Sequence, residues 1–394
     1  MHTTLLGRAE GTGLAAAGAT AAAAAKLNDP IAAAPTHAPN RGLVIAADAS
    51  LRRQKASKKS TREGLAMSKG ASPLAAVLST AVVTVALAGC SGSNQLGDGD
   101  DYIAAITPLN CALDAEIEFA EQNNIGENEQ ITDQTLFNEY KELNLAYANA
   151  ADEAVTALAA KSWPESIKND MADVMADFTI TGALARARVI SDGQNEDEGV
   201  DWDNIMSFNN FYLENSKAPD TTKIRAELGL PETGGYDCEG VELKSDRVTP
   251  SGTGDGAAFE SGQAGLTAIG ALDEEQFFQD LINSKVTYQD LSDEDWSKLM
   301  ANVSLFSDQE LALARELESK EWPEPVKSHI LDYIAYLYVS SAFSRAQVLT
   351  DTVPGDRADF LELDNLSSEW VLKGQRVNFD AIQTGLGLEV QKFG

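Results

Sequence analysis

The three cysteines are the residues whose type and position suggest chemistry most directly. Cys90, Cys111 and Cys238 are the full set in 394 residues. Cysteines used so sparingly, without a Cys-x-x-Cys pair, are typical of an exported protein. After Cys90 the sequence also lacks a glycine-rich phosphate loop and a His-Glu-x-x-His element. The motifs therefore predict no metal, no cofactor and no catalytic residue.

The histidine content also predicts no metal site and no catalytic residue, because His329 is the sole histidine after Cys90. A ferritin-like di-iron site needs Glu-x-x-His pairs on two helices, and neither half of the chain has one. A histidine-based triad has only His329 to draw on, so a solvated helix residue is the favoured interpretation. The acidic stretch 195–201 fails the calcium-loop pattern, since Gln194 stands where an aspartate belongs.

The stretch before Cys90 has the layout of a signal peptide. From Met67 a short basic region leads into an apolar run of 15 residues, 74–88, which ends at Leu87-Ala88-Gly89-Cys90. A membrane-spanning helix needs about 20 apolar residues, so a cleaved signal peptide over residues 67–89 is favoured over a permanent anchor.

Leu87-Ala88-Gly89-Cys90 resembles the lipobox of bacterial lipoproteins, over residues 67–93 only. The resemblance implies that the Cys90 thiol is joined to diacylglycerol and that the freed amine is acylated after cleavage. It thereby implies a lipid anchor in the cell membrane, on its extracytoplasmic face. The alternative is an ordinary cysteine after a conventional secretory cleavage site. The polar stretch 90–101 after the cleavage point predicts a tether.

Charge divides the chain into a basic leader and a strongly acidic remainder. The formal net charge is −31, yet residues 1–89 hold 10 basic and 4 acidic residues, leaving 20 and 57 for residues 90–394. Such acidity repels phosphate backbones, so nucleic acid is not an expected partner. Residues 1–66 are alanine-rich without apolar periodicity, which predicts a disordered leader and an overextended start before Met67.

The acidic part repeats itself at an offset of 159 residues. Trp163-Pro164-Glu165 aligns with Trp322-Pro323-Glu324, and 12 of 32 positions are identical between 161–192 and 320–351. Such self-similarity indicates a duplicated domain. We place the first copy at 102–238 and the second at 264–394. The Gly, Ser and Thr-rich stretch within 239–263 predicts a flexible linker.

Within each copy the apolar spacing is helical. Ile167, Met171, Val174 and Phe178 recur at steps of four and three, and the second copy has apolar residues at the same steps. The sequence therefore predicts an all-α fold made of two tandem, homologous helical bundles. The Trp-Pro-Glu turn joins two helices of each bundle. Trp163 and Trp322 then close the bundle end or, less favoured, stack on a ligand.

The repeat also bears on Cys111 and Cys238. Cys111 is matched by Gly270, and the counterpart of Cys238 would fall beyond the C-terminus, so both are absent together from the second copy. We therefore predict that they form a disulfide, the alternative being two unpaired thiols.

Several charges recur at equivalent positions of the third helix. They are Asp173 and Asp332, Arg186 and Arg345, and Asp192 and Asp351. Each arginine lies next to the apolar face, so it can pair with a carboxylate or present its guanidinium to an anionic ligand. Ion pairing is favoured, and ligand binding stays open.

Three function classes fit these observations. The favoured one is a membrane-anchored, non-enzymatic binding or interaction module for an envelope protein or polymer, in which duplication raises avidity. A carboxylate-dependent envelope hydrolase would need paired acids in a cleft. A solute-binding lipoprotein of a transporter would typically show alternating strands and helices.

Overall fold

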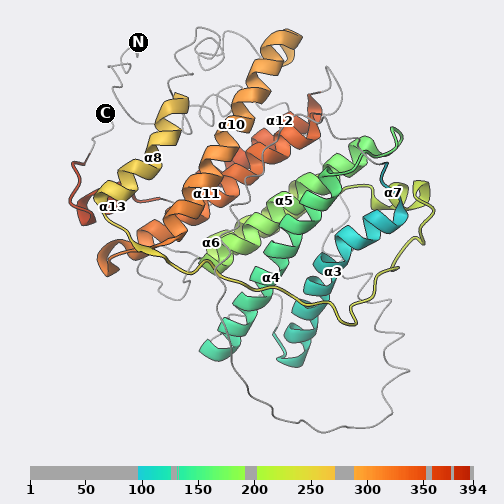
Figure 1. Cartoon of the computed structure of the whole chain (residues 1–394), viewed down its shortest axis with the longest axis horizontal. Helices are drawn as coiled ribbons and strands as arrows, with labels where there is room; N and C mark the ends of the chain where they lie inside the picture. Colours follow the sequence, from blue (N-terminus) through green and yellow to red (C-terminus); the bar gives the residue numbers. More distant parts are fainter. Residues whose placement is uncertain are drawn as a thin grey trace. The chain divides into compact units, whose positions relative to one another are not determined.

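The computed structural model describes residues 96–125, 131, 133–190, 202–270, 288–351, 357–373 and 377–390. The leader, the signal peptide and Cys90 lie outside these ranges, as do Asp192 and the acidic stretch 195–201. Within the described ranges the chain is helical almost throughout, which confirms the all-α helical-bundle fold (Figure 1). None of the described helices combines the length and the apolar character that crossing a membrane requires.

The helices follow the same order in both repeat copies (Figure 1). The first copy contains α3 (Gly99–Gln122), α4 (Gln134–Ala159), α5 (Lys168–Ile190), α6 (Trp202–Asn215) and α7 (Thr221–Glu227). Their counterparts are α8 (Gly256–Gly270), α10 (Asp293–Glu318), α11 (Glu324–Thr350), α12 (Ala358–Lys373) and α13 (Phe379–Gly385). A 3₁₀ turn, η2 (Tyr288–Asp290), precedes α10, and two short strands, β1 (Gly252–Thr253) and β2 (Lys320–Glu321), pair in parallel.

The last helix of each copy ends in the same way. After α7 and α13 the chain turns through Leu-Gly-Leu, with Gly229 at φ 68° and Gly387 at φ 71°. A side chain is strained in this left-handed conformation, so glycine is the residue that ends the helix there. The amide groups of Leu230 and Leu388 then donate 2.8 Å hydrogen bonds to carbonyls of the preceding helical turn. The repeat between the two copies therefore extends to the Leu-Gly-Leu turn that follows the last helix of each copy.

The beginning of each copy is also duplicated, as a Gly-Asp-Gly element. The amide of Gly97 donates to the Ser162 carbonyl at 2.7 Å, and that of Gly254 donates to the Glu321 carbonyl at 2.8 Å. In each copy the first glycine lies directly against the indole ring of the Trp-Pro-Glu turn, where an added Cβ would overlap that ring. These glycines provide a contact surface for tryptophan.

The Gly-Asp-Gly elements place the helix starts earlier than the sequence predicts. Helix α8 begins at Gly256, inside the predicted linker 239–263, and α3 begins at Gly99, inside the predicted tether 90–101. Asp98 caps α3 with its side chain and forms a capping box with Asp101. The glycine-rich composition of these segments predicts a flexible chain, whereas in the structure the glycines allow close packing.

The main core lies between the two copies. Helices α5 and α11 pack side by side, α4 covers α5, and α10 covers α11 (Figure 1). The largest cluster of buried apolar residues draws on both copies and includes Ile180, Leu184, Val339, Phe343 and Trp370, each with no exposed surface. The copies thus share a core, which two independent bundles on a flexible linker would lack.

The central helices are buried on most of their faces. Of 23 residues in α5, 14 are buried, which is expected for a helix covered from several sides. Small residues allow the close approach of its neighbour: a Cβ on Gly182 would lie 2.7 Å from the Cβ of Ala151 in α4. Gly182 is therefore a packing position between α4 and α5.

The predicted disulfide between Cys111 and Cys238 is confirmed. It joins α3 to the segment after α7, with the two Cα atoms 5.6 Å apart and a sequence separation of 127. A cross-link over so long a loop contributes about 2–4 kcal/mol, chiefly by restricting the unfolded chain. The cross-link fixes the start of the connection between the copies.

That connection lies along the first copy. The Asn149 side-chain amide donates to the Lys244 carbonyl at 2.9 Å, and the Lys244 ammonium lies 2.7 Å from Glu153. Farther on, Arg247 pairs with Glu142 at 2.9 Å. Strand β1 then pairs with β2, so the connecting segment contacts both copies.

We expect Gly254→Ala to destabilise the protein. The added Cβ would meet the Trp322 ring at 2.4 Å, so the buried indole must move. The free energy of unfolding should fall by about 1–3 kcal/mol, the usual cost of overpacking. Urea denaturation followed by tryptophan fluorescence measures it.

Gly252→Ala is the matched control, because its Cβ would meet only the Lys320 side chain, at an ordinary 3.7 Å. Its effect should stay within about 0.5 kcal/mol. Equal stabilities of the two variants would contradict the tight glycine–tryptophan contact.

Candidate ligand-binding cleft

A cleft of about 440 Å³ lies where the two copies meet. Its volume is within the range of about 300–1,000 Å³ that small-molecule sites occupy. Helices α4 and α5 form one wall, α11 and the end of α10 form another, and the connecting segment before β1 completes it. The lining residues are Leu145, Arg186, Val189, Ile190, Arg247, Val248, Pro250, Leu317, Glu318, Lys320, Glu321, Trp322, Lys327, Leu331 and Ile334.

The lining is more basic than the chain as a whole. Four basic side chains and two acidic ones line the cleft, although the formal net charge of the chain is −31. The remaining lining is mostly aliphatic. An anion is attracted most strongly to whichever of these cations lacks an acidic partner.

Arg186 is held firmly at the α4–α5 side of the cleft. Its Nη2 donates to Asn149 Oδ1 at 2.9 Å and to Asp152 Oδ2 at 3.1 Å. Its guanidinium carbon lies 5.4 Å from the centre of the Tyr338 ring in the other copy. Burial lowers the pKa of Arg186, but Asp152 and neighbouring acidic groups outweigh this effect, so the net pKa shift is upward. The side chain therefore remains a fixed positive charge.

Glu318 is the acidic group closest to Arg186 in the lining. The Tyr338 hydroxyl donates to Glu318 Oε2 at 2.5 Å, beneath the Arg186 guanidinium. Burial raises the pKa of Glu318, while Tyr338 and Arg186 oppose the shift. This carboxyl group is thus engaged in structure rather than free in the cleft.

The other three cations differ in how far they are neutralised. Arg247 pairs with Glu142 at 2.9 Å, and Lys327 lies 3.4 Å from Glu324 on an exposed helical turn. Lys320 forms no ion pair with the residues that the structure describes. Its backbone is fixed by pairing with Gly252 across the β1–β2 ladder. The backbone of Lys320 is therefore held in place, and its ammonium group has no acidic partner among the described residues.

The sequence-predicted residues divide between cleft and core. Arg186 lines the cleft and is ion-paired with Asp152, and a ligand role for it stays a prediction. Arg345 is not among the lining residues. Burial raises the pKa of Asp308, and Arg345 partly opposes this shift. Each tryptophan of the Trp-Pro-Glu turns donates its indole N–H to a backbone carbonyl: Trp163 to Leu158 at 2.9 Å, Trp322 to Leu317 at 2.8 Å.

Trp322 also lies at the edge of the cleft, whereas Trp163 does not line it. Trp322 is 6% exposed, which leaves little surface for stacking on a ligand. A ligand role for either tryptophan stays a prediction.

Sequence reasoning missed Lys320 and Arg247. Arg247 lies within the predicted linker 239–263, and Lys320 lies two residues before the Trp-Pro-Glu turn, whose recurring tryptophan is the more conspicuous sequence signal. The usable signal was the second Gly-Asp-Gly element, which brings the connecting segment against that turn.

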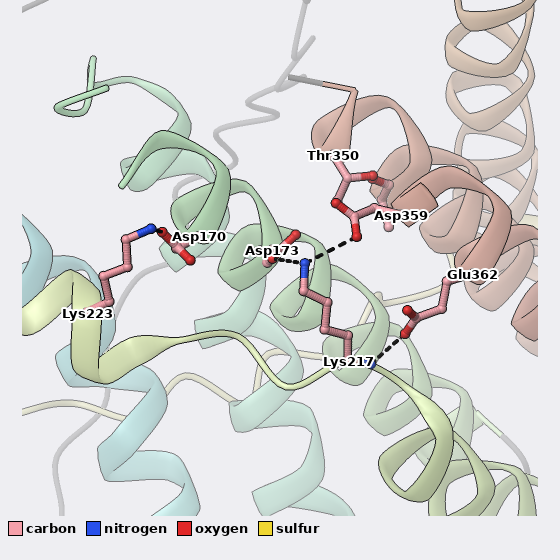
Figure 2. Close-up of polar contacts among 8 residues, drawn as sticks. Asp170, Asp173, Lys217, Lys223, Thr350, Asp359 and Glu362 are labelled. Atoms are coloured by element: carbon pink, nitrogen blue, oxygen red, sulfur yellow. Dashed lines mark hydrogen bonds and ion pairs between the residues drawn. The ribbon is translucent and has the colours of Figure 1, made fainter. Parts of the chain in front are cut away.

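The recurring acidic residues have structural partners. Figure 2 shows Lys217 reaching between Asp173 on α5 and Asp359 on α12, with Nζ–O distances of 3.0 and 3.2 Å. Its backbone amide donates to Glu362 at 2.6 Å. Burial lowers the pKa of Lys217, but the two aspartates outweigh it and the net shift is upward. Lys217 therefore connects the copies through charge.

Other polar positions are likewise occupied by protein partners. Lys223 pairs with Asp170 near the Lys217 group (Figure 2), and Asp351 accepts a 2.9 Å hydrogen bond from the Trp296 indole. Glu310 is fully buried in α10, accepts from the Ser340 hydroxyl at 2.9 Å, and has its pKa raised by burial to about 8. In the described ranges, no group of three or more His, Cys, Asp or Glu residues is arranged to hold a metal ion.

Comparison of the chain with protein-family models, with curated proteins and with solved structures found no match. The functional argument therefore stands on the cleft and on the sequence.

We expect Lys217→Met to lower the free energy of unfolding by about 1 kcal/mol, the upper end for partly exposed ion pairs. Asp173, whose side chain is 13% exposed, would lose its cation. Burial already raises the pKa of Asp173, so the loss should grow as pH rises through that pKa and shrink in acid, where the carboxyl group is protonated. Urea denaturation across a pH series measures this.

Lys244→Met is the control, because Lys244 and Glu153 are both more than half exposed. It should cost less than about 0.5 kcal/mol at every pH. A Lys217→Met loss that did not vary with pH would count against the proposed charge bridge.

Proposed function

We propose that this chain is a lipid-anchored, extracytoplasmic binding module whose ligand occupies the cleft between the copies. The observation that carries the proposal is a cleft of about 440 Å³ that combines aliphatic walls with four basic side chains. Ligand sites commonly join apolar walls to a few well-placed polar groups. Because both copies contribute to one cleft, the proposal is one ligand per chain.

The geometry of the lining favours binding over hydrolysis. A carboxylate-dependent hydrolase needs an acid and a base facing one bond. In the cleft Glu318 is engaged by Tyr338 and Arg186, and Glu321 lies on the exposed strand β2. Neither carboxyl group is placed as such a pair requires, so a binding role is the better account of these residues.

The sequence supports the proposed location. The lipobox-like Leu87-Ala88-Gly89-Cys90 follows a signal-peptide layout and precedes a polar tether. The Cys111–Cys238 disulfide is compatible with an oxidising exterior. An acidic surface gives little attraction to anionic lipids, so acyl chains on Cys90 would supply the membrane attachment.

The binding proposal is tested with Nile red, a neutral apolar dye that fluoresces in apolar sites. The cleft residue Val248 is 39% exposed, so Val248→Trp places a bulky ring at the cleft without disturbing a helix. We expect Val248→Trp to weaken dye binding about tenfold, equivalent to about 1.4 kcal/mol.

Val390→Trp is the matched control, because Val390 is 38% exposed and does not line the cleft. It should bind the dye as the parent does. Failure of the parent to bind, or equal binding by both variants, would argue against an apolar ligand site at the cleft.

The location is tested with Cys90→Ala in the full precursor, expressed in a bacterium that processes lipoproteins. The parent should fractionate with membranes, and its N-terminal peptide should carry the added mass of acyl chains. Cys90→Ala should lose both properties, whereas Ser91→Ala should keep them. A parent chain in the soluble fraction, unacylated and with its leader intact, would refute the anchor.

A further inference from the structure

We propose that the cleft selects an amphipathic organic anion, with the acid group near Lys320 and the apolar part along α5 and α11. The inference rests on the proposed binding function and names its ligand class. Medium-chain alkyl carboxylates have this chemistry, and octanoate serves as the probe.

The choice of an anion follows from the unequal pairing of the cations. Arg186 is engaged by Asn149 and Asp152, and Arg247 by Glu142. Lys320 forms no ion pair with any residue in the described ranges, and its backbone is held in the β1–β2 ladder. An ammonium group without a carboxylate partner gains most from an incoming anion.

The apolar part of the ligand is indicated by aliphatic lining residues that keep exposed surface. Ile190 at the end of α5 and Leu331 of α11 are partly exposed, and Val248 of the connecting segment is 39% exposed. A fully hydrated anion such as acetate would leave this surface in contact with water. An alkyl chain covers it, which makes an amphipathic anion the better fit.

The surroundings reinforce the selectivity for one sign of charge. The chain is strongly acidic, so a cationic amphiphile would find many surface sites and an anionic one very few. At the cleft, Arg186 is engaged by Asn149 and Asp152, so Lys320 is the lining cation that an incoming anion would meet.

The test compares octanoate, 1-octanol and octylammonium, which differ in head-group charge on one alkyl chain. Isothermal titration calorimetry with the purified full-length chain, kept unacylated by Cys90→Ala, should give octanoate an affinity at least about tenfold above the other two. Acetate should bind far more weakly than octanoate. Added salt should weaken octanoate binding and leave octanol unchanged.

Lys320→Gln keeps an unbranched polar side chain and removes the charge, so octanoate affinity should fall about tenfold while octanol affinity stays the same. Lys298→Gln, on an exposed face of α10 outside the cleft, should change neither. Equal affinity for octanol and octanoate, or insensitivity to Lys320→Gln, would overturn the anion assignment and leave the binding function standing. If none of the probes bound and Nile red also failed, both proposals would fall.

Discussion

The packing of α5 against α11 is the interaction on which the rest of the structure depends. Their facing surfaces, with α6 and α12, bury fifteen residues in the main core cluster, and these residues come from both copies. Burial of large apolar side chains such as Phe343 and Trp370 contributes on the order of 2 kcal/mol each. Separating the copies would expose this surface to water. The cleft exists because the two copies are fixed against each other in this way.

Close contacts at small residues set the geometry around that core. Gly97 and Gly254 allow an indole ring to rest on the backbone, and Gly182 allows α4 to approach α5. Each tryptophan also donates to the last turn of the preceding helix. Together these contacts fix the Trp-Pro-Glu turn and the backbone of Lys320, which lies two residues before that turn in the second copy. A residue of the cleft is thus positioned by a structural motif that both copies share.

Charge is distributed unevenly over this framework. Carboxylates dominate the chain, and Lys217 pairs with one from each copy, Asp173 and Asp359. The cleft lining has four basic and two acidic side chains, and Lys320 has no acidic partner among the described residues. An unpaired cation at a cleft of an acidic protein gives selectivity for anions at little cost in solubility. This contrast is the physical basis of the proposed ligand class.

The sequence by itself determined the helical fold, the repeat and the disulfide, because each leaves a local or pairwise mark. Helical spacing is visible within a few turns, and Cys111 and Cys238 are the two cysteines after Cys90, which leaves one pairing between them. The tertiary structure decided which faces meet. A helix buried on most sides, like α5, has no single stripe that names its partner. Arg186, Arg247 and Lys320 therefore come together only because α5 packs on α11 and the connecting segment crosses between them.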